Sequence, residues 1–303
     1  MPDRVKKFFR DVLVILTFLA ASFLPMKAEK IVPDLTYASI GGTALQLDLY
    51  LPEESKPTGL IIWVHGGAWR GGSRKDVDLK GMVARGWAVA SVDYRLSIVA
   101  RFPAQIYDIK AAIRFLRAHA LDYDIPAARF VIAGSSAGAH LAALVGVTNG
   151  HSGLEGNEGF FTGQSSAVQA IVDLYGASDL TTILPQSTPH GLSVRAPALD
   201  LLLGGQPDAL PELAKLASPV FQVDPTDPPL LLEHGDQDPQ MPINQAHELQ
   251  GAYEKLGLPV VFKVMHGSAH GGPAFSNEAN LAFIDAFLRE HLPELKSRTV
   301  KTE

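Results

Sequence analysis

Short apolar runs rich in Val, Ile and Leu alternate with helical segments along most of this chain. Such runs are typical of strands that are buried on both faces of a sheet. The expected strands are Leu60–His65, Ala88–Asp93, Arg129–Gly134, Val168–Tyr175, Leu230–Glu233 and Val260–Val264. The expected helices are Ala104–Ala120, Ala137–Val147, Ile243–Leu256 and Glu278–His291. This alternation predicts an α/β fold, with a mostly parallel central sheet and helices on both of its faces.

Two further strands are expected before this pattern begins. Leu35–Ile40 and Ala44–Tyr50 flank the dipeptide Gly41-Gly42, which is a hairpin signal. The sheet should therefore open with an antiparallel pair. The hydrophobic content of 47% is enough for a buried core, and one domain over residues 29–303 is our first choice.

One long connection interrupts the alternation. Residues 176–229 are rich in Pro and Gly and carry only short stretches with a helical pattern, Pro197–Leu203 and Ala209–Ala217. Ligands of open α/β sheets bind outside the carboxyl ends of the strands. We therefore interpret residues 176–229 as an insertion over the site.

The first 28 residues have the pattern of a secretory signal peptide. Basic residues between Arg4 and Arg10 precede the apolar run Val12–Leu24, and Ala28 is a small residue near a suitable cleavage position. The run is short for a bilayer core of about 30 Å at 1.5 Å per residue. We expect cleavage and a secreted or periplasmic bacterial protein without stable membrane association. An uncleaved anchor or a buried helix is the alternative.

Composition excludes several classes of site. The chain has no cysteine, which removes disulfides, thiolate zinc sites, iron–sulfur clusters and a cysteine nucleophile. Its net charge is −6, and Lys and Arg cluster only at the N-terminus, so nucleic acid is not an expected partner. No group of His and carboxylate residues has metal-ligand spacing. We expect no metal and no cofactor, and the oligomeric state is left open.

A candidate nucleophile follows the strand that ends at Gly134. The segment Gly134-Ser135-Ser136-Ala137-Gly138 matches G-x-S-x-G between an apolar strand and a helix, which is the context of a nucleophile elbow. The glycines allow a tight turn on which the central hydroxyl is exposed. Ser136 is thus the expected nucleophile, and Ser135 is the competing hydroxyl.

An unactivated serine needs a histidine base and a carboxylate that orients this base. His270 lies in the loop after the last expected strand, from which it can reach over the sheet, and His266 is its rival there. The carboxylate should lie between serine and histidine in the chain, after the preceding strand. Asp238 fits best, because Asp236 is close enough to the strand to form the turn with its own backbone.

Backbone N–H groups for an oxyanion are expected from the loop after the strand Leu60–His65. Gly66 and Gly67 have no Cβ to block the approach, and the N–H of Ala137 would complete the oxyanion hole. We interpret His65 as a residue that holds this loop. Trp69, together with the insertion, is expected to contact the substrate and to set specificity.

Several segments together resemble a known family. They occur in the order and spacing of the α/β-hydrolase fold and are His65–Trp69, Val92–Leu96, Gly134–Gly138, Asp173–Leu180, Asp238 and Gly267–Gly272. The chain resembles the esterase/lipase superfamily, in its bacterial feruloyl and acetylxylan esterase-like (BD-FAE-like) branch. The resemblance runs from about Leu35 to His291.

The resemblance implies an exported serine carboxylic ester hydrolase for short-chain acyl, feruloyl or acetyl esters, small or polysaccharide-linked. Hormone-sensitive-lipase-like relatives usually carry a third glycine and an Asp where this chain has Ala68 and Ser135. Kynurenine formamidase-like relatives share the patterns at His65–Trp69 and Ser136–Leu141. An arylformamidase, or an amidase or peptidase with the same triad, is therefore the alternative function.

Overall fold

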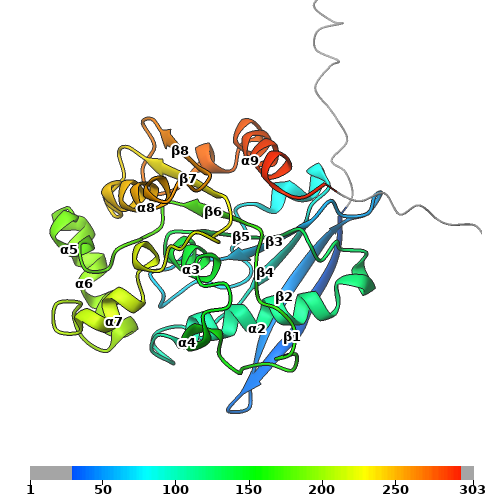
Figure 1. The fold of residues 1–303 in the computed structure, drawn as a ribbon, viewed down its shortest axis with the longest axis horizontal. Helices are drawn as coiled ribbons and strands as arrows, with labels where there is room; N and C mark the ends of the chain where they lie inside the picture. The colour runs from blue at the N-terminus through cyan, green and yellow to red at the C-terminus, as the bar shows by residue number, and fades with distance from the viewer. Residues whose placement is uncertain (1–28, 295–303) are drawn as a thin grey trace, which may run out of the picture.

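A computed structural model describes residues 29–294, which are built around one eight-stranded sheet (Figure 1). The strands are β1 (Glu29–Ile40), β2 (Thr43–Pro52), β3 (Leu60–Val64), β4 (Ala88–Val92), β5 (Phe130–Ser135), β6 (Ala170–Leu174), β7 (Leu230–Gly235) and β8 (Val260–Met265). Their order in the sheet is β1-β2-β4-β3-β5-β6-β7-β8. The pairs β1–β2 and β2–β4 are antiparallel and all other pairs are parallel, which confirms the predicted sheet.

Both faces of the sheet are covered. Side chains of β3 alternate between two cores, with Ile62 and Val64 in one and Ile61 and Trp63 in the other. The first core also holds residues of α2, α3 and α8, and the second holds residues of η1 and α9. The elements on these faces are η1 (Lys80–Arg85), α2 (Ala104–Ala118), α3 (Ala137–Gly146), α8 (Asn244–Lys255) and α9 (Glu278–His291). Shorter elements are η2 (Ala120–Tyr123), α4 (Ser152–Glu155) and η4 (Pro273–Phe275).

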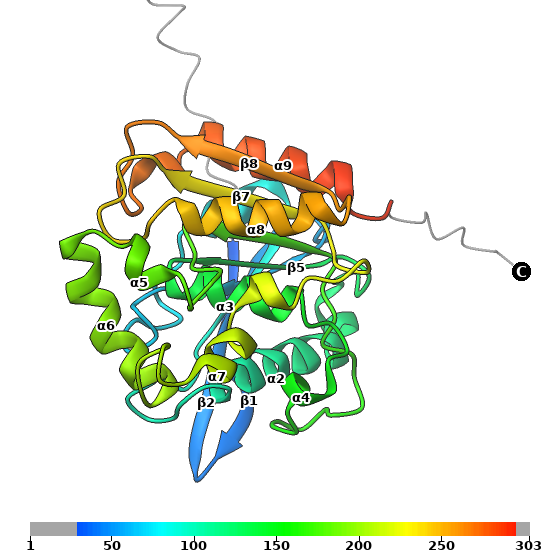
Figure 2. The same cartoon turned by 60° about the vertical axis from the view of Figure 1, so that its left-hand side comes forward.

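The connection between β6 and β7 is more regular than expected. It contains α5 (Ile183–Gln186), α6 (Pro189–Leu203), α7 (Pro211–Leu216) and η3 (Pro219–Phe221). Helices α5, α6 and α7 lie at the left of Figure 1, and α5 and α6 remain at the left in Figure 2. We expected only short helical stretches, the first beginning at Pro197. Helix α6 has 15 residues and begins eight residues earlier, where the Thr188 hydroxyl accepts the Gly191 N–H at 3.0 Å.

The carboxyl ends of the central strands meet at one edge of the sheet. Val64 at the end of β3 pairs with Gly134, and Ser135 at the end of β5 pairs with Leu174 of β6. The segments that follow these strands, and those that follow β7 and β8, therefore share this edge. The expected signal peptide, residues 1–28, lies outside the described residues. Within residues 29–294, no helix has the length and apolar character needed to cross a membrane.

Candidate active site

Ser136 lies on a sharp turn between β5 and α3. Its backbone has φ +54° and ψ −119°, a conformation that few residues other than glycine adopt. The turn is tight enough to exclude side chains on both sides of it. A Cβ on Gly138 would lie 2.1 Å from the Val64 carbonyl oxygen, and one on Gly134 would lie 2.4 Å from the Gly138 carbonyl carbon. The two glycines of the motif therefore let strand, turn and helix pack together.

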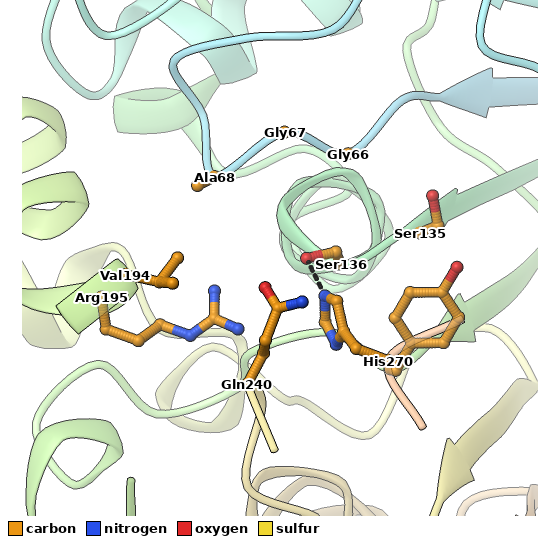
Figure 3. A pocket seen from close by; sticks show the side chains of 10 residues that line it. Gly66, Gly67, Ala68, Ser135, Ser136, Val194, Arg195, Gln240 and His270 are labelled. Carbon is orange, nitrogen blue, oxygen red and sulfur yellow. Dashed lines mark hydrogen bonds between the residues drawn. The ribbon is translucent and has the colours of Figure 1, made fainter. Parts of the chain in front are cut away.

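The structure brings the three expected triad residues into one chain of hydrogen bonds. His270 Nε2 lies 2.8 Å from Ser136 Oγ, and His270 Nδ1 lies 2.6 Å from an Asp238 carboxylate oxygen (Figure 3 shows the Ser136–His270 bond). A carboxylate that accepts the Nδ1 proton leaves Nε2 free to accept the serine proton. Ser135 points away from this pair in Figure 3 and has no bond to His270. The arrangement can activate the Ser136 hydroxyl as a nucleophile.

Asp238 is held by several donors at once. One carboxylate oxygen accepts the N–H groups of Gln240 at 2.8 Å and Met241 at 2.9 Å, while the other faces His270. Burial alone would raise the pKa of Asp238. The hydrogen bonds from His234, His270 and Met241 outweigh burial and hold this pKa well below its usual value. Asp238 is therefore ionised at neutral pH and keeps His270 oriented.

Asp236 and His266 form a second pair in the same two loops. One Asp236 oxygen lies 2.8 Å from His266 Nδ1, and the other accepts the Gly267 N–H at 2.8 Å. Neither residue contacts Ser136. We expected Asp236 to bond its own backbone, and it instead ties the turn after β7 to the loop after β8.

The loop after β3 approaches Ser136 closely. A Cβ on Gly66 would lie 3.4 Å from that of Ser136, and Gly66, Gly67 and Ala68 line the pocket beside it (Figure 3). Gly67 has φ +106° and leaves no room for a side chain, since its Cβ would meet the Gly71 oxygen at 2.2 Å. The N–H groups of Gly67 and Ala68 donate to no acceptor among the described residues.

The third expected donor of the oxyanion hole lies outside this loop. Ala137 is the first residue of α3, where backbone N–H groups have no partner within the helix. Gly66 lies beside Ser136, and Ala137 is the next residue after Ser136 in the chain. His65 Nδ1 donates to the Gly66 oxygen at 2.8 Å, and its ring stacks on Tyr94, an arrangement that holds the loop.

Trp69 does not lie where we expected it. Its side chain is fully buried and does not line the pocket. The indole N–H donates to His140 Nδ1 at 3.1 Å, and His140 Nε2 donates to the Ala217 oxygen at 2.7 Å. Burial lowers the pKa of His140 to about 4, so the ring is neutral and can accept from the indole. The large indole is thus held in the core, and this placement does not support contact with substrate.

Several pocket residues were not identified from the sequence. The pocket has a volume of about 280 Å³ and is also lined by Tyr175, Val194, Arg195 and Gln240. The Tyr175 ring packs edge-on against His270 with 4.8 Å between centroids. Val194 and Arg195 lie on α6, and no local pattern indicates which face of that helix meets the site. Within the described chain, no group of three or more His, Asp or Glu side chains could hold a metal ion.

The comparison with protein families supports the expected family. The family model BD-FAE matches residues 47–253. Esterase LipC of Mycobacterium tuberculosis is 32% identical over 225 residues, which cover 72% of this chain and 54% of LipC. The chain spans about half the length of the curated relatives it matches.

Solved structures agree with this match. A truncated carbohydrate esterase from gut microbiota superposes with a TM-score of 0.79 at 32% identity, covering 88% of this chain and 97% of the other. A bifunctional GH43-CE protein of Bacteroides eggerthii has a TM-score of 0.76 at 34% identity, covering 86% of this chain and 35% of that protein. The fold is that of these α/β-hydrolase esterases.

Proposed function

The chain belongs to the BD-FAE family, and from this premise we propose that it is a serine carboxylic ester hydrolase. The observation that carries the proposal is the chain of hydrogen bonds from Asp238 through His270 to Ser136. Its support is twofold, because the relatives are named as esterases and the three groups have the geometry that acyl transfer requires.

The proposed reaction has two halves. Ser136 Oγ attacks the ester carbonyl carbon while His270 Nε2 takes the hydroxyl proton. The resulting oxyanion is bound by N–H groups of Gly66, Gly67 and Ala137, each worth on the order of 3 kcal/mol. His270 then protonates the leaving alcohol, and water activated by the same histidine releases the acid and restores Ser136.

Labelling with a fluorophosphonate tests the nucleophile. We expect one adduct, which peptide mass mapping locates on Ser136, and we expect Ser136→Ala to lower kcat by about 10⁴-fold or more. Ser135→Ala is the matched control and should still be labelled. An adduct on Ser135, or none on the folded wild type, would refute the assignment.

For the substrate, we propose short-chain acyl, feruloyl or acetyl esters, including carbohydrate-linked ones. A small pocket and a solved relative named as a carbohydrate esterase support this class. Each buried CH₂ contributes roughly 0.8 kcal/mol only while the pocket has room for it. On p-nitrophenyl esters, kcat/KM should therefore peak between acetate and butyrate and fall at least about tenfold at C10.

One panel tests that substrate class. It contains the p-nitrophenyl esters, methyl ferulate, acetylated xylan and N-formylkynurenine. A kcat/KM on the formamide above that on every ester would favour an arylformamidase instead.

We also propose that residues 1–28 are a cleaved export signal, on the charge and hydropathy pattern of that segment. In a bacterial host, the full chain should reach the periplasm or medium with an N-terminus near Glu29. A product that begins at Met1 and sediments with membranes would contradict this proposal.

A further inference from the structure

Arg195 extends from α6 into the pocket that contains Ser136. Its side chain is almost entirely buried, at 1% exposure, and it lines the pocket together with Gln240 and Val194. In Figure 3 the guanidinium points toward Gln240 and the Ser136–His270 pair. A buried cation therefore forms part of the wall of the proposed active site.

This guanidinium has no partner within residues 29–294. No carboxylate oxygen lies within 4.0 Å of it, and Nε and Nη2 are buried without a hydrogen bond. Other arginines with little exposure among residues 29–294 have partners. Arg95 donates to both oxygens of Asp108, and Arg114 bonds the Glu155 carbonyl oxygen at 3.0 Å.

The charge of Arg195 is also not neutralised by the triad. The two Asp238 oxygens already accept from His270 and from the Gln240 and Met241 N–H groups. Burial lowers the pKa of Arg195 to about 10, although Asp238 acts in the opposite direction. The group is therefore a cation at neutral pH. Burying a cation without a partner costs folding free energy. We therefore expect the bound ligand to supply an anionic partner for Arg195.

We propose that Arg195 is a specificity-determining residue that binds a carboxylate carried by the substrate close to its scissile ester. This inference rests on the proposed ester hydrolase function. A guanidinium presents N–H groups in a planar fork that matches a carboxylate, and such charge-assisted bonds are among the strongest available. A neutral ester would leave the cation unpaired in the occupied pocket. The carboxylate can belong to the acyl group or to the alcohol, and the recognition chemistry is the same.

Two matched ester pairs test this proposal and separate the two sources of the carboxylate. In the acyl pair, 4-nitrophenyl hemisuccinate is compared with 4-nitrophenyl 4-methylpentanoate, in which an isopropyl group replaces the carboxylate. In the alcohol pair, acetoxyacetate is compared with isobutyl acetate in a pH-stat. In at least one pair, wild-type kcat/KM should be about tenfold or more higher for the charged ester, equivalent to about 1.4 kcal/mol.

Variants of Arg195 then test whether this side chain causes the preference for the charged ester. Arg195→Gln should abolish it, mainly by raising KM for the charged ester, and Arg195→Lys should restore part of it. Lys255→Gln is the control, because it removes one exposed positive charge from the end of α8 and should change neither member of a pair.

Two results would overturn the inference. One is a wild type that prefers neither charged ester, which decides the matter even if Arg195→Gln fails to fold. The other is a preference that persists in a folded Arg195→Gln variant, as judged by circular dichroism. Both differ from failure of the proposed function, in which the wild type would hydrolyse none of the four esters.

Discussion

Two Asp–His pairs lie between the loops after β7 and β8, and they differ in surroundings more than in geometry. Asp238–His270 and Asp236–His266 have separations of 2.6 and 2.8 Å, both through Nδ1. The His270 side chain is 11% exposed and its Nε2 faces Ser136, whereas that of His266 is 83% exposed. The first pair is enclosed by the pocket and the second lies in solvent.

The difference shows which property makes such a pair useful for catalysis. Hydrogen bonds lower the pKa of both aspartates, so a depressed carboxylate pKa does not distinguish them. An exposed ion pair is screened by water and adds little beyond local order. A buried pair whose second ring nitrogen reaches a hydroxyl can move a proton. The predictions below test whether this contrast decides activity.

Substitution of the two histidines should give the largest difference in kcat. His270→Ala removes the only base in contact with Ser136 Oγ within residues 29–294, and kcat should fall by roughly 10⁵- to 10⁶-fold. His266→Ala should change kcat less than about threefold. Steady-state kinetics on p-nitrophenyl acetate measure both. A larger loss at His266 would reverse their roles.

The two aspartate variants should differ in kcat by a smaller factor than the two histidine variants. Asp238→Asn leaves the imidazole without an acceptor for its Nδ1 proton and favours the wrong tautomer, so kcat should fall by on the order of 10⁴-fold. Asp236→Asn retains an oxygen for the Gly267 N–H and should act on loop stability alone. Comparable losses of kcat in the two variants would contradict this assignment.

His140 extends the comparison to a histidine that is fully buried without a carboxylate. Its folded pKa of about 4 lies below an unfolded value near 6.5, so the unfolded chain binds one more proton between these values. Protonation of His140 in the unfolded chain therefore lowers the free energy of unfolding as pH falls from about 6.5 to 4, by roughly 3 kcal/mol in total. In His140→Gln the slope of unfolding free energy against pH should flatten by about one proton over that window, as measured by urea denaturation.

The smallest effect concerns Trp69. Trp69→Phe removes the donor to His140 Nδ1 and should lower the free energy of unfolding by about 1–2 kcal/mol. Because the indole does not line the pocket, KM for p-nitrophenyl acetate should change less than threefold. A tenfold rise in KM at unchanged kcat would instead indicate that Trp69 contacts the substrate.

The parallel strands could be predicted because they are short apolar runs, and the bounds of α2, α3, α8 and α9 lie within two residues of the expected ones. Two starts are wrong, since β1 begins six residues before the expected Leu35 and α6 eight residues before the expected Pro197. The positions of Ser136, Asp238 and His270 could be predicted because each lies in the segment that follows a strand of one parallel sheet. Ser136 directly follows β5, whereas Asp238 and His270 lie three and five residues after β7 and β8. Trp69 could not be placed, because whether a loop indole faces a pocket or the core depends on a partner 71 residues away. Thr188 followed by Pro189 is a local signal for the start of α6, and Pro197 lies inside that helix, so the expected start at Pro197 is wrong.

The bond from His140 to the Ala217 carbonyl limits how this protein could be re-engineered. Residues 176–229 carry Arg195 and leave the triad intact, which makes them an attractive cassette for grafting a new specificity. The same segment, however, supplies the acceptor that fixes His140, and through His140 the indole of Trp69. A transplanted cassette must therefore present a carbonyl at the position of Ala217, because the exchange would otherwise leave the buried His140 ring without its acceptor.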